Sequence, residues 1–489
     1  MKEEESYSFG AAEPTELSPE EFRRAGHDLV DWISSYLAHP ERYRVLSQVR
    51  PGELLDTLAP DPPERPSPQA EILADFEHDV LPRAVHWNHP GFMAYFAAGG
   101  SSPGILGETL AAALNNVGLL WRSSPALAEL EECTLRWLGR LLGLPGHWFG
   151  LIHDTASTAT LHAVIAGRQS ALERAGRSGS ELDLNRIVIY TSAQAHSSVE
   201  RAMAALGRGF EACRKIPCDD RFAMRPEALR QSIAADLRDG FQPIAVVATV
   251  GTTASAGVDP VGTVAEIAAE HSLWLHVDAA YAGPAAMLPE MREHFAGCER
   301  ADSFVVNPHK WLFVPMDCSV MYTSRPESFR RALSLVPEYL RSGDHPRAVN
   351  YMEYSIPLGR RFRALKLWYV LRSFGSERIA ATLREHVRLA RLIAEWVDAA
   401  PDFERMAPTH FSLVCLRVVP PNVTDAEIDR ANEKLLGAVN DTGEFFLSHA
   451  RLADRYVIRV AIGNIRTTEA HVRRLWELLQ RCARSALAP

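Results

Sequence analysis

The sequence predicts an α/β protein that is built on one large, mostly parallel β-sheet and followed by a smaller α+β region. From about residue 100, short runs rich in valine and isoleucine alternate with helical stretches. These runs are apolar on both faces, as the strands of a buried parallel sheet are, and the helices between them would cover its faces. After about residue 375 the alternation stops, so we expect a different arrangement there.

Length and charge bound the class of protein. The 489 residues suffice for two or three domains with one large core. The net charge of −9 provides no basic surface for nucleic acid, and no long apolar run predicts a membrane span. Seven scattered cysteines and an acidic, polar N-terminus without a hydrophobic leader predict reduced thiols in a cytoplasmic protein.

The first expected element is a helix that begins after Ser18. Ser18 is a suitable N-cap, Pro19 fits the first helical position, and Glu21 completes a capping box. The helix that follows carries an apolar stripe, which requires a partner surface. The stripe consists of Phe22, Leu29, Ile33 and Leu37. We expect residues 1–100 to form a helical segment that precedes the large sheet.

The large sheet is expected within residues 101–375. Its candidate strands are the apolar runs Phe149–His153, Ile187–Tyr190, Ile244–Val250, Leu273–Val277, Ser303–Val306 and Cys318–Tyr322. Helical segments such as Ser157–Ala175 and Val261–His271 lie between them. Residues 376–489 form the small domain, with a helix at Ile379–Ala399, strands at Ser412–Val419 and Tyr456–Ile462, and helices that begin near Thr424 and Thr468.

Lysine is scarce in this chain, which makes Lys310 informative. The chain has only five lysines, and an arginine cannot be deprotonated to serve as an amine nucleophile. Lys310 follows directly on the predicted strand at Ser303–Val306 and is flanked by apolar residues. Burial lowers the pKa of an ammonium, and a neutral amine can form a Schiff base with an aldehyde. The alternative is a surface lysine whose stem lies along apolar neighbours.

Asp278 ends the predicted strand at Leu273–Val277, at the edge where open α/β sheets place their ligands. A carboxylate there could pair with the ring nitrogen of pyridoxal phosphate and keep that ring protonated. The separation of 32 positions between Asp278 and Lys310 leaves room for a crossover and a second strand. The alternative role for Asp278 is a helix or turn cap.

Three further segments could serve a phosphate-bearing, flat cofactor. The hydroxyl-rich segment from Asp154 to Thr160 lies between a strand and a helix, where free N–H groups suit a phosphate. Thr253 follows another strand end. His196 could stack on a flat ring, although a lone histidine is more often a core or surface residue. The motifs of serine hydrolases, P-loop proteins, zinc proteases and dinucleotide-binding proteins are missing from the sequence, and it has no clustered metal ligands.

Together these residues resemble the group II pyridoxal-phosphate decarboxylases, most closely the aromatic-L-amino-acid decarboxylases. The resemblance runs from Glu20 to the C-terminus, and the block from Asn307 to Trp311 is its most specific part. It implies fold type I of the pyridoxal-phosphate enzymes, the aspartate-aminotransferase-like fold with a seven-stranded large sheet. It also implies a homodimer that exchanges its N-terminal helices and has the active site at the interface.

The resemblance also implies roles for individual residues. Lys310 would hold the cofactor covalently, Asp278 would pair with its ring nitrogen, and His196 would stack on the ring. Thr253 would lie near the cofactor and the substrate carboxylate. The remaining implied cofactor contacts are Ala280 on the ring and Ala156, Ser157, Asn307 and His309 around the phosphate. The implied substrate pocket comprises Trp87, Tyr95, Phe96, Val117, Leu119, His309, Ile356 and Gly359.

Two positions bear on the reaction and the substrate. Tyr339 matches the loop tyrosine that helps to protonate Cα in the family, whereas related aldehyde synthases have phenylalanine there, so Tyr339 favours amine formation. Val117 and Leu119 replace the isoleucine and phenylalanine of the animal enzymes, which would widen the pocket. A glycine at position 359 accompanies indole substrates in plant relatives, but phenol-using relatives also carry it, so the substrate ring stays open.

The expected function is decarboxylation of an aromatic L-amino acid to its arylalkylamine and carbon dioxide, with tryptophan, 3,4-dihydroxyphenylalanine, tyrosine or phenylalanine as the substrate. Two alternatives use the same cofactor, namely an aromatic aldehyde synthase and a decarboxylase of histidine or glutamate. A third is a scaffold or binding protein that keeps the fold without the cofactor.

Overall fold

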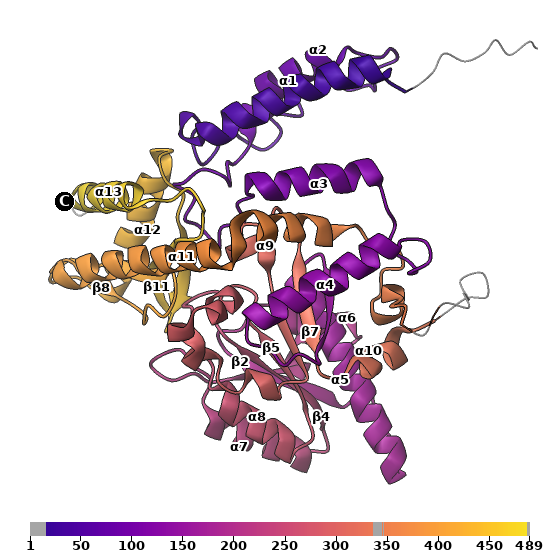
Figure 1. Ribbon diagram of the computed structural model, residues 1–489. Helices are drawn as coiled ribbons and strands as arrows, with labels where there is room; N and C mark the ends of the chain where they lie inside the picture. Colours follow the sequence, from indigo (N-terminus) through magenta and orange to yellow (C-terminus); the bar gives the residue numbers. More distant parts are fainter. Residues whose placement is uncertain (1–15, 336–344, 346, 487–489) are drawn as a thin grey trace, which may run out of the picture. The chain divides into compact units, whose positions relative to one another are not determined.

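The computed structural model describes residues 16–335, 345 and 347–486, so Tyr339 lies outside the described residues. The chain divides into two compact units, Met1–His86 and Trp87–Pro489 (Figure 1). The domain boundaries that we expect at residues 100 and 375 stay predictions. Across the described ranges, no helix is long and apolar enough to cross a membrane.

The first unit is built around α1 (Pro19–Ala38) and α2 (Gln69–Asp75). The capping box at Ser18 and Glu21 is confirmed, because each side chain accepts the other residue's backbone N–H. Aromatic contacts fasten α1, where Trp32 packs edge-on against Phe76, the residue after α2, with ring centroids 5.4 Å apart. No residue of α1 is buried, and Phe22 is 67% exposed, so the predicted apolar stripe remains open in the single chain.

The second unit contains the large sheet. Among the described residues it has seven strands in the order β1-β7-β6-β5-β4-β2-β3. These are β1 (Phe149–His153), β2 (Ile187–Ser192), β3 (Cys213–Ile216), β4 (Gln242–Thr249), β5 (Trp274–Asp278), β6 (Ser303–Val306) and β7 (Ser319–Thr323). The predicted α/β class is confirmed. One correction concerns β7, predicted at Cys318–Tyr322, which runs antiparallel to both of its neighbours.

Helices cover both faces of this sheet, and the side chains of β4 alternate between the two hydrophobic cores that these helices form with it. Val246 and Ala248 belong to the core that includes α7 and α8, whereas Ala245 and Val247 belong to the core that includes α5 and α6. The helices of the large-sheet region are α3 (Ser102–Leu114), α4 (Pro125–Leu141), α5 (Ala156–Ser178), α6 (Ser198–Ala205), α7 (Pro226–Arg238), α8 (Val261–Glu270), α9 (Pro308–Trp311) and α10 (Pro326–Leu333). The helices on the two faces shield the strands from solvent.

The edge strand β3 was not predicted from the sequence, and its charged residues explain why. Its two central residues are Arg214 and Lys215, which form ion pairs with Asp236 and Glu200. An edge strand needs only one neighbour and can present charged side chains, so it lacks the apolar signature of the interior strands.

A second sheet lies near the C-terminus and is antiparallel throughout, in the order β10-β11-β9-β8. Its strands are β8 (Phe403–Arg405), β9 (Leu413–Val418), β10 (Ser448–Leu452) and β11 (Arg455–Ala461), and the nearby helices are α11 (Arg363–Ala399), α12 (Asp425–Asp441) and α13 (Glu469–Ala486). The predicted strands and the capping box at Thr424 are confirmed. In α11 the backbone leaves helical geometry at Gly375, which has a φ of 66°.

Candidate active site

The carboxyl ends of several strands converge at one edge of the large sheet. Asp278 at the end of β5 lies in register between Thr249 of β4 and Val305 of β6. The short helix α9, which carries Lys310, follows β6 after a single residue. Because β7 is antiparallel to both β1 and β6, β1 points the same way as β6, and α5 begins at this edge too.

Lys310 lies in a setting that favours a neutral amine. Burial lowers the pKa of its ammonium, the charge of Asp278 opposes this effect, and the charge of Arg459 adds to it. The Nζ atom is 5.5 Å from the centroid of the Phe96 ring. Phe96 itself is buried and stacks on Tyr281 at 3.8 Å between centroids. The amine of the partly buried Lys310 therefore lies beside an aromatic face.

The other lysines have different environments. Lys215 pairs with Glu200 at 3.0 Å, and the fully buried Lys366 pairs with Glu108 at 2.7 Å. Lys434 is exposed on α12, and Lys2 lies outside the described residues. Carboxylates engage Lys215 and Lys366, so Lys310 is the best-suited nucleophile among the lysines that the structure describes.

Asp278 is 6% exposed, and both roles considered for it have support in the geometry. Its Oδ1 atom accepts a hydrogen bond of 3.0 Å from the N–H of Ala280, which is a turn cap. Its charge also acts on three titrating neighbours, namely Lys310, His196 and His276. Capping therefore fixes the carboxylate in place at the strand end, where it can interact with a cationic partner.

His196 belongs to the same charge cluster. Desolvation by the surrounding protein atoms lowers the pKa of its imidazole, although the residue is exposed in the single chain. The charge of Asp278 raises this pKa, and the charge of Lys310 lowers it. Its Nδ1 atom accepts a hydrogen bond of 3.1 Å from the N–H of Ser198. The ring is thus held from one side while a face remains open.

The predicted phosphate contacts combine a helix start with polar side chains. Thr155 precedes α5 without a side-chain cap, so the N–H groups of Ala156 and Ser157 at the helix start lack that partner. Asn307 accepts a hydrogen bond of 2.7 Å from the Ser319 hydroxyl. These N–H groups and the positive end of the helix dipole suit an anion.

His309 is kept neutral. Burial lowers the pKa of its imidazole to about 4, with a further contribution from the charge of Lys310. The Nδ1 atom accepts a hydrogen bond of 2.9 Å from the N–H of Cys318, which places the proton of the neutral ring on Nε2. His309 can therefore donate a hydrogen bond from Nε2.

The predicted substrate residues fall into two environments. Phe96 lies beside Lys310, whereas Trp87, Tyr95, Val117 and Ile356 are exposed, and Leu119 is partly buried. The rings of Trp87 and Tyr95 stack with centroids 6.1 Å apart. A side-chain carbon at Gly359 would lie 3.5 Å from Cγ1 of Val117, an ordinary contact. The Ile356 N–H donates to His162 on α5 at 2.9 Å.

Arg459 is a residue that the sequence analysis missed. It comes from β11, is 3% exposed, and its guanidinium lies 5.3 Å from the Phe96 ring centroid. It donates hydrogen bonds to the carbonyls of Thr253 at 2.7 Å and Tyr95 at 3.3 Å, and thereby ties two predicted site residues together. A charged residue in the middle of the apolar run Tyr456–Ile462 was the signal that could have revealed it.

This donor set fits pyridoxal phosphate. The amine of Lys310 suits the aldehyde, the carboxylate of Asp278 suits a protonated ring nitrogen, and the start of α5 suits the phosphate. All three groups lie at one edge of the sheet, and charge coupling links Lys310, Asp278 and His196. The roles of the individual residues stay predictions.

Comparison with known proteins agrees with this arrangement. The conserved domain of pyridoxal-dependent decarboxylases matches residues 51–419. The chain is 41% identical to tyrosine decarboxylase 2 of Arabidopsis thaliana over 96% of this chain and 88% of that protein. It is also 40% identical to a phenylacetaldehyde synthase of the same plant, over 95% of this chain and 96% of that protein.

Solved structures are similar over nearly the whole chain. The tryptophan decarboxylase of Oryza sativa with pyridoxal phosphate and tryptamine superposes with a TM-score of 0.93 at 36% identity, covering 96% of this chain and 99% of that one. The enzyme of Catharanthus roseus in complex with L-tryptophan gives a TM-score of 0.90 at 38% identity and the same coverage. The predicted fold type I is confirmed. The chain belongs to the pyridoxal-dependent decarboxylase family and is a carboxy-lyase that uses pyridoxal phosphate.

Proposed function

We propose that this chain removes the carboxylate of an aromatic L-amino acid to give the arylalkylamine and carbon dioxide. The observation that carries the proposal is the cluster of Lys310, Asp278 and His196 beside the aromatic wall of Phe96. The names of the similar proteins, which include tyrosine and tryptophan decarboxylases, support an aromatic substrate.

Each residue of the cluster has a separate task in this proposal. Bound pyridoxal phosphate supplies an electron sink for the pair left on Cα when the bond to the carboxylate breaks. Lys310 would hold the cofactor through its amine, and this attachment requires the unprotonated form that its burial favours. Asp278 holds a proton at the ring nitrogen. His196 packs on the ring and fixes its plane.

The substrate would be oriented by its ring and its carboxylate. Phe96 stacks on Tyr281, and Arg459 joins the backbone carbonyls of Tyr95 and Thr253, so contacts of one guanidinium link these two predicted site residues. The aromatic wall of Phe96 can hold the side chain of the amino acid so that its carboxylate stands perpendicular to the cofactor ring. Correct orientation of the breaking bond contributes to catalysis before any proton moves.

We propose that the active site is completed by a second copy of the chain. Helix α3 presents Leu106, Leu110 and Leu114 at intervals of four residues, and all three are exposed in the single chain. Exposed stripes of this kind mark protein interfaces. Of the predicted pocket residues, Trp87, Val117 and Ile356 are exposed as well, so a partner surface over them would close the pocket.

The proposed dimer can be tested with two variants, each of which replaces an exposed leucine by glutamate. Leu110→Glu on α3 is expected to produce monomers in sedimentation analysis and to lose decarboxylase activity. Leu237→Glu, at a similarly exposed leucine on α7, should leave the dimer intact. A dimer that survives Leu110→Glu would show that α3 is not the interface.

The reaction is tested by a substrate and product screen on the purified protein with its cofactor. The panel consists of tryptophan, tyrosine, phenylalanine, 3,4-dihydroxyphenylalanine, histidine and glutamate, with amine, aldehyde, carbon dioxide and peroxide measured for each. The proposal predicts amine and carbon dioxide in equal amounts from an aromatic substrate. Aldehyde with peroxide as the main products would assign the chain to the aldehyde synthases, and turnover of glutamate or histidine alone would refute the aromatic substrate.

A further inference from the structure

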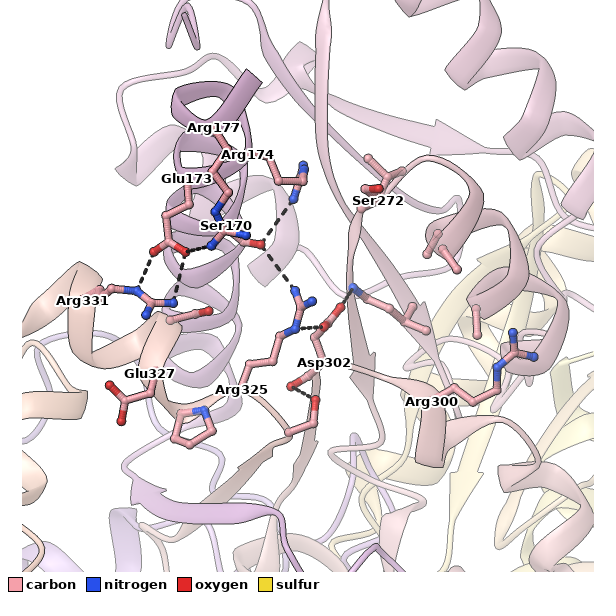
Figure 2. A pocket seen from close by; sticks show the side chains of 18 residues that line it. Ser170, Glu173, Arg174, Arg177, Ser272, Arg300, Asp302, Arg325, Glu327 and Arg331 are labelled. Carbon is pink, nitrogen blue, oxygen red and sulfur yellow. Dashed lines mark hydrogen bonds and ion pairs between the residues drawn. The ribbon is translucent and has the colours of Figure 1, made fainter. Parts of the chain in front are cut away.

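A cavity of about 610 Å³ lies at the opposite end of the large sheet from Asp278 (Figure 2). Leu273 and Leu275 line it where β5 begins, whereas Asp278 ends this strand, about 13 Å further along at the usual rise of a strand. On α5 the lining starts at Ser170, about 21 Å along the helix axis from Ala156 at the predicted phosphate site. The cavity is therefore separate from the candidate active site.

Arginine side chains dominate the lining of this cavity. We call it the arginine-rich cavity, and its charged residues are the cations Arg174, Arg177, Arg300, Arg325 and Arg331 and the anions Glu173, Asp302 and Glu327. Five guanidinium groups face three carboxylates in the lining, and Glu266 outside it pairs with Arg300 at 3.4 Å, which leaves an excess of one positive charge. Figure 2 shows the side chains of Arg174, Arg325 and Arg331 gathered around Ser170 and Glu173.

Two of the guanidinium groups converge on one uncharged atom. Nη1 of Arg174 and Nη1 of Arg325 both donate to the Ser170 hydroxyl oxygen, at 3.3 and 3.4 Å. Burial lowers the pKa of Arg174, and the neighbouring charge of Arg325 lowers it further, while Asp302 opposes both effects. Two like charges are thus held side by side with Asp302 as a shared counter-charge, and a multivalent anion would add to this stabilisation.

The carboxylates of the cavity are shared among the arginines. Glu173 accepts two hydrogen bonds from Arg331, at 2.6 and 3.1 Å, and also lies 3.7 Å from Arg177. Asp302 pairs with Nε of Arg325 at 3.2 Å, while its other oxygen accepts the Leu275 N–H at 2.8 Å. Glu173 and Asp302 therefore each serve more than one donor, and their negative charge falls short of the positive charge around them.

We infer that the arginine-rich cavity binds a small phosphate-bearing molecule with two or more negative charges. The planar forks of guanidinium groups match phosphate oxygens in pairs, and several guanidinium groups around one cavity favour a multivalent anion. The volume lies in the range of small-molecule sites. Ala265, Ala268 and Leu273 provide an apolar wall against which an organic portion of the ligand can lie.

The test uses the protein with its cofactor bound, so that the active-site phosphate position is already filled. Pyrophosphate, adenosine diphosphate and citrate are titrated separately by calorimetry at low salt. We expect saturable binding of pyrophosphate at one site per chain, weakened by added salt. Adenosine diphosphate that binds at least as tightly as pyrophosphate would show that the apolar wall contributes, whereas weaker binding of the nucleotide would limit the ligand to small inorganic phosphates.

Arginine variants test whether pyrophosphate binds in the arginine-rich cavity. Arg174→Gln and Arg325→Gln should each weaken pyrophosphate binding by about tenfold or more, because each removes a charge-assisted hydrogen-bond donor. Arg177→Gln, whose side chain is 77% exposed, gives a variant with little risk to folding and should also weaken binding. Arg384→Gln removes an arginine that pairs with Glu290 and does not line the cavity, and it should bind like the parent protein.

Three results would overturn the inference, the first two of which concern pyrophosphate. One is the lack of saturable pyrophosphate binding at millimolar concentration. The other is binding that the three cavity variants leave unchanged, which would place the anion elsewhere. Citrate that binds more tightly than both phosphate compounds would also contradict it, because the preferred ligand would then be a polycarboxylate.

Discussion

At the carboxyl ends of β5 and β6, Lys310 and Asp278 lie among aromatic rings, whereas at the amino ends of the same strands five arginines surround an open cavity. The difference lies in which cation each end holds. Burial can bring a lysine amine toward neutrality, which permits covalent chemistry, but a guanidinium stays charged in a protein. One end of the sheet is therefore suited to react with a ligand, and the other only to bind one.

The largest effect is expected from the tyrosine that the family resemblance places at the reactive end. Tyr339→Phe removes a proton donor and should lower amine formation by about 100-fold to 10,000-fold, with cofactor binding retained. Aldehyde production is the expected side reaction. Product analysis alongside cofactor absorbance checks this, and an unchanged rate of amine formation would show that the proton comes from another group.

A pair of aspartate variants compares the two ends directly. Asp278→Asn removes the charge that acts on Lys310 and should lower kcat/KM by about 10-fold to 100-fold with little change in stability. Asp302→Asn breaks the half-exposed pair with Arg325 and should lower the free energy of unfolding by about 1 kcal/mol, with kcat/KM preserved. Equal losses of kcat/KM in the two variants would show that the two ends of the large sheet do not differ in their importance for catalysis.

Gly359→Ser sharpens the description of the reactive end. The added side-chain carbon meets Val117 at an ordinary distance, so the fold should tolerate it, and the hydroxyl adds polarity to the predicted pocket. We expect kcat/KM for tyrosine relative to tryptophan to rise by about tenfold. Gly146→Ser, at a position with open space, is the matched control. An unchanged substrate ratio would remove Gly359 from the pocket.

The last prediction concerns stability against pH at a buried histidine. Burial lowers the pKa of His386 to about 4, and its Nδ1 atom accepts a hydrogen bond of 2.9 Å from Trp311. The unfolded chain binds a proton at this residue below pH 6.5 while the folded protein does not, so folding loses stability as pH falls from 6.5 toward 4. His386→Asn should reduce this slope by about 1.4 kcal/mol per pH unit in urea unfolding. An equal slope would mean that His386 titrates normally.

The fold was predictable where each residue's local environment determines its type. The interior strands are continuous apolar runs, and the capping boxes at Ser18 and Thr424 are local hydrogen-bond patterns, so both could be predicted from the sequence. The strands β3, β8 and β10 could not, because they are short edge strands of their sheets and carry charged or polar residues. The antiparallel direction of β7 is set by pairing across the sheet, which no local pattern records.

The residues of the candidate active site were likewise predictable only where a local sequence pattern marks them. Lys310 and Asp278 were found because each stands at the end of an apolar run, whereas Arg459 is more than 140 residues from both and joins them only through the second sheet. The arginine-rich cavity likewise brings together Arg174, Arg300 and Arg325 from separate elements. Contacts between residues distant in the chain are what the sequence analysis missed.

The central claim is that Lys310 is the amine that holds the cofactor. Reduction of the holoenzyme with borohydride, followed by proteolysis and peptide mass mapping, tests it directly. The account predicts one pyridoxyl phosphate group per chain on the peptide that contains Lys310, and no label in Lys310→Ala, while Lys434→Ala is labelled like the parent. A group attached instead at Lys215 or Lys366, or undiminished labelling of Lys310→Ala, would contradict it.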